Sequence, residues 1–353
     1  MKMQAPDDGV FASIHRVFLP KWRSQLNVLF ALPTRTPLQV AYYRSAEFRD
    51  ALNELLPHHE LCLAHLIRTG DYVRALKNIP TVLEMTDAIS LNYERVKARG
   101  GKKSLKEWVY TIEASRLLRY ERRAIDEFSL VTLVSSTDRD FLLEGRPSEK
   151  ILVCSNGVDL KNFPFSTRRE SKPVIAYIGN MTSVQNMDAC IYFAEQVMPL
   201  VPRELDAVFR VVGKISDNDA ERLRAYANVE VTGAVDNVAD AVVDARVGVC
   251  PVRLAAGVQN KVLEYMALGL PVITSSIGLE GFSAIPNHDV LVADEPMDYV
   301  KMIKQVWERN EWALQIAENG RSYVERKHEW SSQLNGLVVQ VSDLLSRHPV
   351  FTH

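Results

Sequence analysis

The C-terminal half of this sequence alternates short apolar runs with amphipathic helical segments, and this alternation restricts the possible folds more than any other feature. Runs that predict buried strands occur at residues 173–180, 207–213, 229–233, 246–252, 270–276 and 289–294. Strands connected through helices form right-handed crossovers, and hence a parallel sheet covered on both faces. We therefore predict a doubly wound α/β domain over residues 174–345, with its ligand beyond the carboxyl ends of the strands.

A second α/β domain is predicted in the N-terminal half, over residues 1–163. A helical pattern at 44–56 precedes its strand-like runs, which lie at 60–67, 79–87, 130–136 and 150–159. Residues 164–173 are polar, contain proline and lack periodicity, which predicts a linker. A chain of 353 residues is also longer than one core normally extends, so two domains are expected.

Large aromatic side chains recur in the long amphipathic stretch from Pro296 to Leu345. Aromatic residues at helical spacing are more often core than ligand-stacking surface. We therefore expect helices packed on the C-terminal sheet, with these side chains in the core: Trp307, Trp312, Tyr323 and Trp330.

The net charge of −2 gives the chain no overall attraction for nucleic acid or an anionic membrane, so no nucleic-acid partner is expected. Residues 95–123 are locally basic, with ten Lys and Arg residues against three Glu. This stretch is either a solvated helical face or a patch that binds lipid headgroups at the cytoplasmic face of the inner membrane.

The sequence shows no signal for secretion or membrane insertion. Residues 1–18 lack the apolar core of a signal peptide, and no run approaches the roughly 20 apolar residues of a membrane span. The cysteines at 62, 154, 190 and 250 have neither C-x-x-C pairing nor histidines at zinc spacing, so we expect free thiols and no metal. These features predict a cytoplasmic protein, with peripheral membrane contact as the alternative.

The segment 251–282 carries the clearest chemical signal. A strand ends at its start, small residues form a loop at 255–257, and a helix is expected to begin near Val258. Amide groups at a helix start, together with the helix dipole, favour phosphate oxygens. Lys261 and Arg253 could neutralise a diphosphate bound there.

Glu264 follows about two turns into this predicted helix, at 3.6 residues per turn. Its neighbours are apolar: Val262, Leu263, Tyr265 and Met266. A carboxylate in such surroundings costs several kcal/mol unless it has a partner. We therefore interpret Glu264 as a ligand-binding residue that can accept both hydroxyls of a ribose, in preference to a solvated surface residue.

The run GVQNKVLEYMALGLPVI resembles the signature of the retaining glycosyltransferases of family 4, which have the two-domain GT-B fold. The segments SNGVD, YIGN, VTGAVDNV and GLEGF agree with it. PLQVAYYRS and TDAISLNYER further resemble a bacterial subgroup that builds exopolysaccharide, including sugar transferases associated with PEP-CTERM export. The resemblance implies two Rossmann-like domains facing a cleft. It also implies transfer of a sugar from a UDP- or GDP-linked donor to a lipid-linked or saccharide acceptor with retention of configuration, a hexosyltransferase-type reaction without metal or other cofactor.

The same resemblance assigns roles to individual residues. Glu264 would bind the ribose. The diphosphate would be bound by Lys261 and Arg253 together with the Gly257 and Val258 amides. The segment 231–234, with Thr232, would flank the base, and Gly179 and Asn180 would lie at the opening of the donor domain. His65 would approach the transferred sugar, and Asp87 would face the cleft. The roles of the last two are catalytic and come from the resemblance alone, since an isolated histidine is often a core residue.

Three departures from the family's pattern bear on activity. Ala256 stands where the signature has a Glu that contacts the donor sugar, and YIGNMTSVQN offers Asn180 and Gln185 in place of an Arg and a Lys. The opening strand with its glycine-rich loop is not found, which predicts an incomplete N-terminal domain. The run 24–32 has the apolar pattern of a strand, but PTRTP, without glycine, follows it.

Two other functions therefore stay open. The chain could be a catalytically impaired nucleotide-sugar binding protein of the same fold. The missing opening unit and Ala256 favour this alternative. A nucleotide-sugar epimerase is less favoured, because the sequence offers few further His and Glu candidates for acid-base work.

Overall fold

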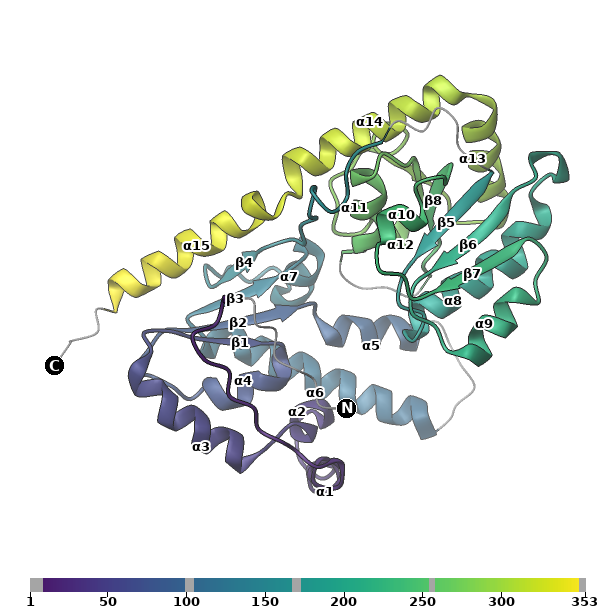
Figure 1. Cartoon of the computed structure of the whole chain (residues 1–353). Coiled ribbons are helices and arrows are strands. Elements are labelled where there is room, and N and C mark those ends of the chain that lie inside the picture. The colour runs from purple at the N-terminus through teal and green to yellow at the C-terminus, as the bar shows by residue number, and fades with distance from the viewer. Residues whose placement is uncertain (1–8, 99–104, 167–172, 254–257, 349–353) are drawn as a thin grey trace.

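The computed structural model describes residues 9–98, 105–166, 173–253 and 258–348, which form two α/β domains (Figure 1). Each domain has its own sheet and its own hydrophobic core. The predicted fold class is confirmed. The strands lie inside the runs predicted from the sequence, because these runs carry the apolar side chains that a parallel sheet buries under its helices.

The N-terminal sheet is parallel, with the strand order β1-β2-β3-β4. Its strands are β1 (Cys62–His65), β2 (Thr81–Thr86), β3 (Leu130–Leu133) and β4 (Ile151–Val153). The surrounding helices are α1 (Lys21–Ala31), α2 (Leu38–Tyr42), α3 (Ala46–Leu55), α4 (Ile67–Val73), α5 (Ile89–Ala98), α6 (Leu105–Glu127) and α7 (Ser136–Leu143). Serine hydroxyls fix several helix starts: Ser45 accepts a hydrogen bond from the Phe48 amide at the start of α3, and Ser135 caps α7.

The C-terminal sheet is also parallel and has the order β10-β9-β8-β5-β6-β7. Its strands are β5 (Val174–Ile178), β6 (Val208–Val212), β7 (Val229–Gly233), β8 (Val247–Cys250), β9 (Val272–Thr274) and β10 (Leu291–Val292). The helices are α8 (Val184–Tyr192), α9 (Asp217–Arg224), α10 (Val238–Ala241), α11 (Asn260–Ala267), α12 (Ser276–Leu279), α13 (Pro296–Glu308), α14 (Asn310–Lys327) and α15 (Trp330–Arg347). This is the order of a doubly wound dinucleotide-binding sheet.

β1 forms an edge of the N-terminal sheet, and the strand-like run at residues 24–32 does not extend the sheet there. In the described residues β1 pairs only with β2, so its other side has no strand partner. Residues 24–32, whose apolar run resembles a strand, instead contribute to helix α1 and its C-cap. Pro20 precedes this helix and Pro33 follows its C-cap, so prolines bound it on both sides.

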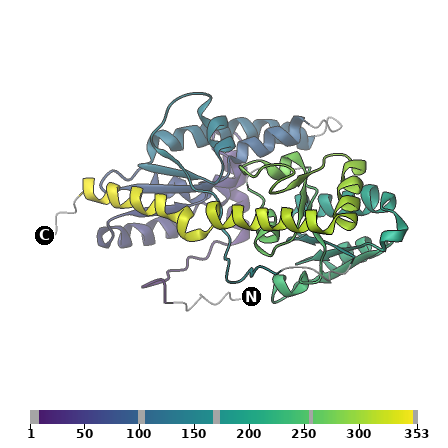
Figure 2. The same cartoon turned by 90° about the horizontal axis from the view of Figure 1, so that it is seen from above.

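Helix α15 does not stay with the C-terminal domain, although the sequence pattern placed residues up to 345 there. It extends away from α14 and along the N-terminal domain (Figures 1 and 2). The Cys154 thiol beside β4 donates to the Gln333 carbonyl (3.3 Å), which fixes the crossing. Trp330, expected in the core, is 42% exposed, whereas Trp307 and Trp312 pack against the core and Tyr323 is buried.

The two domains meet through further contacts at the carboxyl ends of the N-terminal strands. The Asn156 side-chain amide, after β4, donates to the Asn260 side-chain oxygen at the start of α11 (2.7 Å). Arg95 of α5 forms an ion pair with Glu280, after α12. The predicted linker falls largely at 167–172, outside the described residues.

Candidate functional site

The carboxyl ends of β5 and β8 mark the position where this type of sheet binds its ligand. From β5 the chain proceeds outward through β6 and β7, and from β8 it proceeds in the opposite direction through β9 and β10. The ladder between β5 and β8 is short and pairs only Ile175 with Val247 and Ala176 with Gly248. Beyond this point the two strands separate, which creates the crevice of a topological switch point.

Tyr265 anchors helix α11 against this crevice. Its hydroxyl is buried, accepts a hydrogen bond from the Ile178 amide (2.6 Å) and lies within donating distance of the Ala176 and Val249 carbonyls (3.2 and 3.3 Å). The tyrosine therefore replaces the ladder hydrogen bonds that β5 and β8 no longer exchange. Its ring also explains Gly248, because a Cβ there would lie 2.4 Å from the ring.

The start of α11 differs slightly from the sequence prediction. The helix begins at Asn260, two residues after Val258, which is buried just ahead of it and faces Gly281. Gly257 lies outside the described residues. Ser135, at the end of β3, approaches the same Gly281, since a Cβ on this glycine would lie 3.3 Å from the serine hydroxyl. The carboxyl edges of both sheets thus face each other near the start of α11.

Lys261 is held in place by side-chain oxygens. Its ammonium donates to Asn186 Oδ1 (3.1 Å) and Gln259 Oε1 (3.3 Å) and lies 5.4 Å from the centre of the Tyr177 ring. The Tyr177 hydroxyl donates to the same Asn186 oxygen (2.9 Å), and Asn186 in turn donates to the Asn180 carbonyl (2.9 Å). No carboxylate among the described residues forms a salt bridge with Lys261. Asn186, which sequence reasoning missed, organises this side of the site.

Arg253 is bound by a second residue that sequence reasoning missed. It makes a two-pronged ion pair with Asp188 of α8 (3.1 and 2.6 Å) and stacks over the Tyr192 ring at 4.5 Å. Its positive charge is therefore already compensated, in contrast to the expectation that it is available to a diphosphate. A side chain that is 45% exposed can still contact a ligand, but Lys261, unlike Arg253, has no acidic partner among the residues that the structure describes.

Glu264 is half-buried on the otherwise buried surface of α11. Burial raises the pKa of its carboxyl, and the nearby Lys261 charge acts in the opposite direction. In the described part of the chain no side chain or amide donates a hydrogen bond to this carboxylate. A partly desolvated carboxylate without a protein donor is suited to accept ligand hydroxyls.

Gly179, Asn180 and Thr232 lie at the carboxyl edge of the same sheet. Gly179 follows β5 and touches Gly213, whose φ of 129° and close approach exclude a side chain: a Cβ would lie 2.0 Å from the Gly179 carbonyl. Asn180 turns its side-chain oxygen toward the amide and hydroxyl of Thr182 (3.1 and 2.8 Å). Thr232 is exposed near the end of β7, two strands away from β5.

The N-terminal domain contributes a strained pair of strand ends. His65 ends β1 and its Nδ1 pairs with the Glu84 carboxylate of β2. The same carboxylate accepts a hydrogen bond from the Thr86 hydroxyl (2.9 Å). Leu66 and Thr86 have φ values of 66° and 65°, a conformation that is costly for a β-branched residue and is often found at functional sites.

Asp87 follows directly in a group of desolvated carboxyls. Burial, with the charges of Asp138 and Glu84, raises the pKa of Asp87 to about 6. Burial also raises the pKa of Asp138, which accepts a hydrogen bond from the Ala88 amide (3.0 Å). Among the described residues no hydrogen bond or ion pair connects His65 or Asp87 with the donor-side residues, so their catalytic roles stay a prediction.

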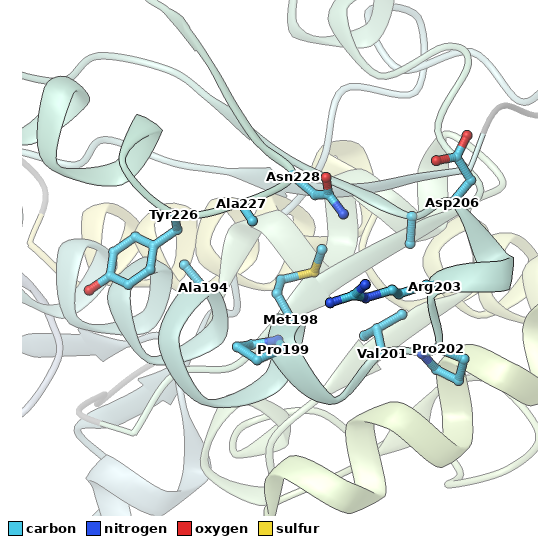
Figure 3. Close-up of a pocket in the computed structure, with 11 residues that line it drawn as sticks. Ala194, Met198, Pro199, Val201, Pro202, Arg203, Asp206, Tyr226, Ala227 and Asn228 are labelled. Atoms are coloured by element: carbon cyan, nitrogen blue, oxygen red, sulfur yellow. The ribbon is translucent and has the colours of Figure 1, made fainter.

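A separate pocket of about 550 Å³ lies elsewhere in the C-terminal domain (Figure 3). Met198 and Arg203 extend into it from the segment after α8. Ala207 directly precedes β6 and Asn228 directly precedes β7, so the pocket lies at the amino ends of these strands. Because such sheets bind ligands at the carboxyl ends, this pocket is not the donor site.

Within the described ranges, no group of three or more His, Cys, Asp or Glu side chains is arranged to hold a metal ion. None of the described helices is long and apolar enough to cross a membrane.

Comparison with known proteins agrees with this geometry. Residues 172–309 match the protein family described as Glycosyl transferases group 1. A Klebsiella pneumoniae protein, described as an uncharacterized 44.6 kDa protein in the cps region, is 22% identical over 164 residues, which cover 44% of this chain. The match spans 42% of that relative's length.

Solved structures share the fold across both domains. Sucrose-phosphate synthase from Thermosynechococcus elongatus gives a TM-score of 0.68 at 18% identity, covering 85% of this chain and 78% of that one. HepE from Anabaena in complex with UDP gives 0.66 at 14% identity, covering 87% and 82%. A further HepE structure contains UDP-glucose. The chain therefore has the GT-B fold of these glycosyltransferases, and residues 172–309 in its C-terminal half match the glycosyl transferases group 1 family.

Proposed function

We propose that this protein transfers a sugar from a nucleotide-sugar donor to a lipid-linked or saccharide acceptor, with retention of configuration, as a member of family 4. The observation that carries the proposal is the placement of Glu264 and Lys261 on α11, at the crevice between β5 and β8. The carboxylate has no hydrogen-bond donor and the ammonium no acidic partner among the described residues. A ribose and a diphosphate supply the missing groups.

UDP is the nucleotide that the comparisons favour, because HepE binds UDP and UDP-glucose with a similar fold. Glu264 accepts the two ribose hydroxyls, and Lys261 binds the diphosphate. Asn186 keeps the ammonium directed into the crevice. Arg253, tied to Asp188, serves first to position α8 and then as a secondary contact to the diphosphate.

The reaction requires no base that fully ionises the acceptor. The bond between the anomeric carbon and the diphosphate oxygen breaks, the acceptor oxygen bonds to the same face of that carbon, and the departing diphosphate takes the acceptor proton. Catalysis is then mainly stabilisation of the leaving group by preorganised positive charge. Lys261 provides that charge, while His65 and Asp87 contact the sugar and the acceptor from the opposite domain.

Peripheral contact with a membrane through residues 95–123 remains part of the proposal for a lipid-linked acceptor. Four basic residues of this stretch have carboxylate partners: Arg95 with Glu280, Arg116 with Glu113, Arg122 with Glu144 and Arg123 with Glu127. Arg119 and Arg123 are exposed.

Calorimetric titration of UDP and GDP into the full chain tests the donor site. We expect one nucleotide to bind the parent protein and to bind Glu264→Ala at least about tenfold more weakly, which corresponds to about 1.4 kcal/mol. Glu318→Ala, which removes an exposed glutamate of α14, is the matched control and should bind like the parent. Equal binding by the parent and Glu264→Ala would place the nucleotide elsewhere.

A catalytically impaired nucleotide-sugar binding protein is the second candidate, favoured by the unpaired edge of β1 in the described residues and by Ala256. Incubation with UDP-glucose and acceptor separates the two functions. Release of UDP with a product whose anomeric proton shows the donor's configuration supports the transferase. Binding without turnover of donors supports the impaired protein.

A further inference from the structure

A cavity of about 410 Å³ in the N-terminal domain is lined almost entirely by guanidinium groups. Its arginines come from three separate parts of the chain: Arg35 between α1 and α2, Arg146 after α7, and one side of α6 with Arg116, Arg119, Arg122 and Arg123. Tyr120 and Asp126 complete the lining, so a single carboxylate faces six arginines. Like charges gathered in one cavity repel each other and favour a bound anion.

Half of these arginines have carboxylate partners. Arg116 pairs with Glu113 (2.9 Å), Arg122 with Glu144 (2.5 Å) and Arg123 with Glu127 (3.1 Å). These pairs keep the side chains in place, and the hydrogen bond from Arg122 is the main reason why the pKa of Glu144 is lowered.

The other three arginines have no carboxylate partner among the described residues. Arg119 and Arg146 each donate Nε to a carbonyl of their own segment, Ser115 and Leu143, which leaves their terminal nitrogens available. Arg35 has no hydrogen-bond partner in the described part of the chain. In addition, the Nε of Arg122 is buried and has no acceptor within the described ranges. The cavity thus holds more donors than the described residues satisfy.

We propose that this arginine cavity is a binding site for a phosphate-bearing anion. Guanidinium groups bind phosphate oxygens in pairs of parallel hydrogen bonds, which suits a cavity with several of them on converging walls. The inference does not depend on the proposed glycosyl transfer. Asp126 and Arg146 lie shortly before β3 and β4, toward the amino ends of these strands, whereas the donor-side residues lie at carboxyl ends.

The phosphate group can belong to a soluble anion or to a phospholipid headgroup. Helix α1 borders the cavity, because the Leu32 carbonyl at its C-cap accepts a hydrogen bond from Arg116 (2.5 Å). This helix exposes Trp22, Leu29 and Phe30, which are 59%, 58% and 72% exposed. Exposed apolar side chains beside a basic site are typical of proteins that lie on an anionic bilayer surface.

Two probes distinguish the sources with the full-length protein. The first is calorimetric titration of inorganic tripolyphosphate, and the second is co-sedimentation with phosphatidylglycerol/phosphatidylcholine vesicles, compared with phosphatidylcholine alone. The test variant carries Arg35→Gln, Arg119→Gln and Arg146→Gln, which breaks no salt bridge of the described residues. The matched control removes three exposed cations of the C-terminal domain with the same change in net charge: Arg222→Gln, Lys304→Gln and Arg326→Gln.

We expect the parent and the control to bind at least one probe, and the cavity variant to bind it at least about tenfold more weakly. Loss confined to tripolyphosphate identifies a soluble anion, and loss confined to anionic vesicles identifies a headgroup. Failure of the parent to bind either probe, an unaltered cavity variant, or an equal loss in the control overturns the proposal. UDP titration of the cavity variant, which should match the parent, keeps this outcome separate from that of the donor site.

Discussion

Replacing Tyr265 by phenylalanine removes one oxygen atom at the point where β5 and β8 separate. The ring that fills the space over Gly248 remains, so the change affects hydrogen bonding without creating a large cavity. The lost hydroxyl accepts from the Ile178 amide at 2.6 Å and lies in contact with two carbonyls. No water can replace it without opening the core, because the side chain is fully buried.

The magnitude follows from the group that is left without a partner. A buried amide that loses its acceptor costs about 1–3 kcal/mol. We therefore expect Tyr265→Phe to lower the free energy of unfolding of the C-terminal domain by about 2 kcal/mol, in the middle of that range. Because the same hydroxyl anchors α11, affinity for UDP should fall as well.

Tyr299 supplies the control. It is also fully buried in the C-terminal core, but its hydroxyl has no hydrogen-bond partner among the residues described by the structure. Tyr299→Phe removes an unsatisfied polar group, so its effect should be close to zero or slightly stabilising. Both variants delete the same atom from the same residue type in one core, and they differ in whether that atom is hydrogen-bonded.

Chemical denaturation by guanidinium chloride, followed by circular dichroism, measures both variants against the parent, with the midpoint as the readout at unchanged slope. A loss in Tyr299→Phe as large as that in Tyr265→Phe would refute the reasoning, since it would show that packing and not the bridge between β5 and β8 determines the cost.

Three other changes test the donor site, the buried carboxyl group of Glu121 and the proposed catalytic role of Asp87. Asn186→Ala releases Lys261, and calorimetry should show UDP affinity reduced about tenfold, whereas Asn319→Ala should leave it unchanged. Burial raises the pKa of Glu121 to about 8, so the folded state favours the protonated carboxyl and loses stability as the pH rises from about 4.5 to 8. The stability of Glu121→Gln relative to the parent should therefore be higher at pH 8 than at pH 5, by more than about 1 kcal/mol. Denaturation midpoints at the two pH values, converted to free energies of unfolding, measure this difference. With the pKa of Asp87 raised to about 6, kcat/KM should decline below that pH, and Asp87→Asn should lower activity and remove this limb of the profile; an identical limb in the variant would assign it to another group.

The C-terminal domain could be predicted closely from the sequence because its central strands β5 and β8 are buried on both faces, although the edge strand β7 is only partly buried. Five consecutive buried residues, as in β5, leave little choice of environment or period. The small-residue loop and the apolar helical run that follows it likewise predict α11. The same run predicts that Glu264 and Lys261 lie on this helix. The helix begins at Asn260, two residues later than the predicted start near Val258.

Contacts between distant elements could not be predicted in the same way. Asn186 and Asp188 lie on α8, and only the fold brings them to Lys261 and Arg253. A single Asn or Asp in an amphipathic helix carries no periodic signal that separates it from a solvated residue. The ion pair between Arg253 and Asp188 could therefore not be predicted from the sequence, and the role of Arg253 at the diphosphate stays a prediction.

The return of α15 to the N-terminal domain has a consequence for how the molecule comes apart. A chain that passes between two domains once is divided into them by a single cut, but here the polypeptide passes between them twice. A protease acting in the segment 164–173 would release an N-terminal fragment that lacks the helix covering β4, while α15 remained part of the other fragment. The two fragments should then stay together in solution, because α15 of the C-terminal fragment packs on the N-terminal fragment. For the same reason, neither domain could be exchanged alone between related proteins.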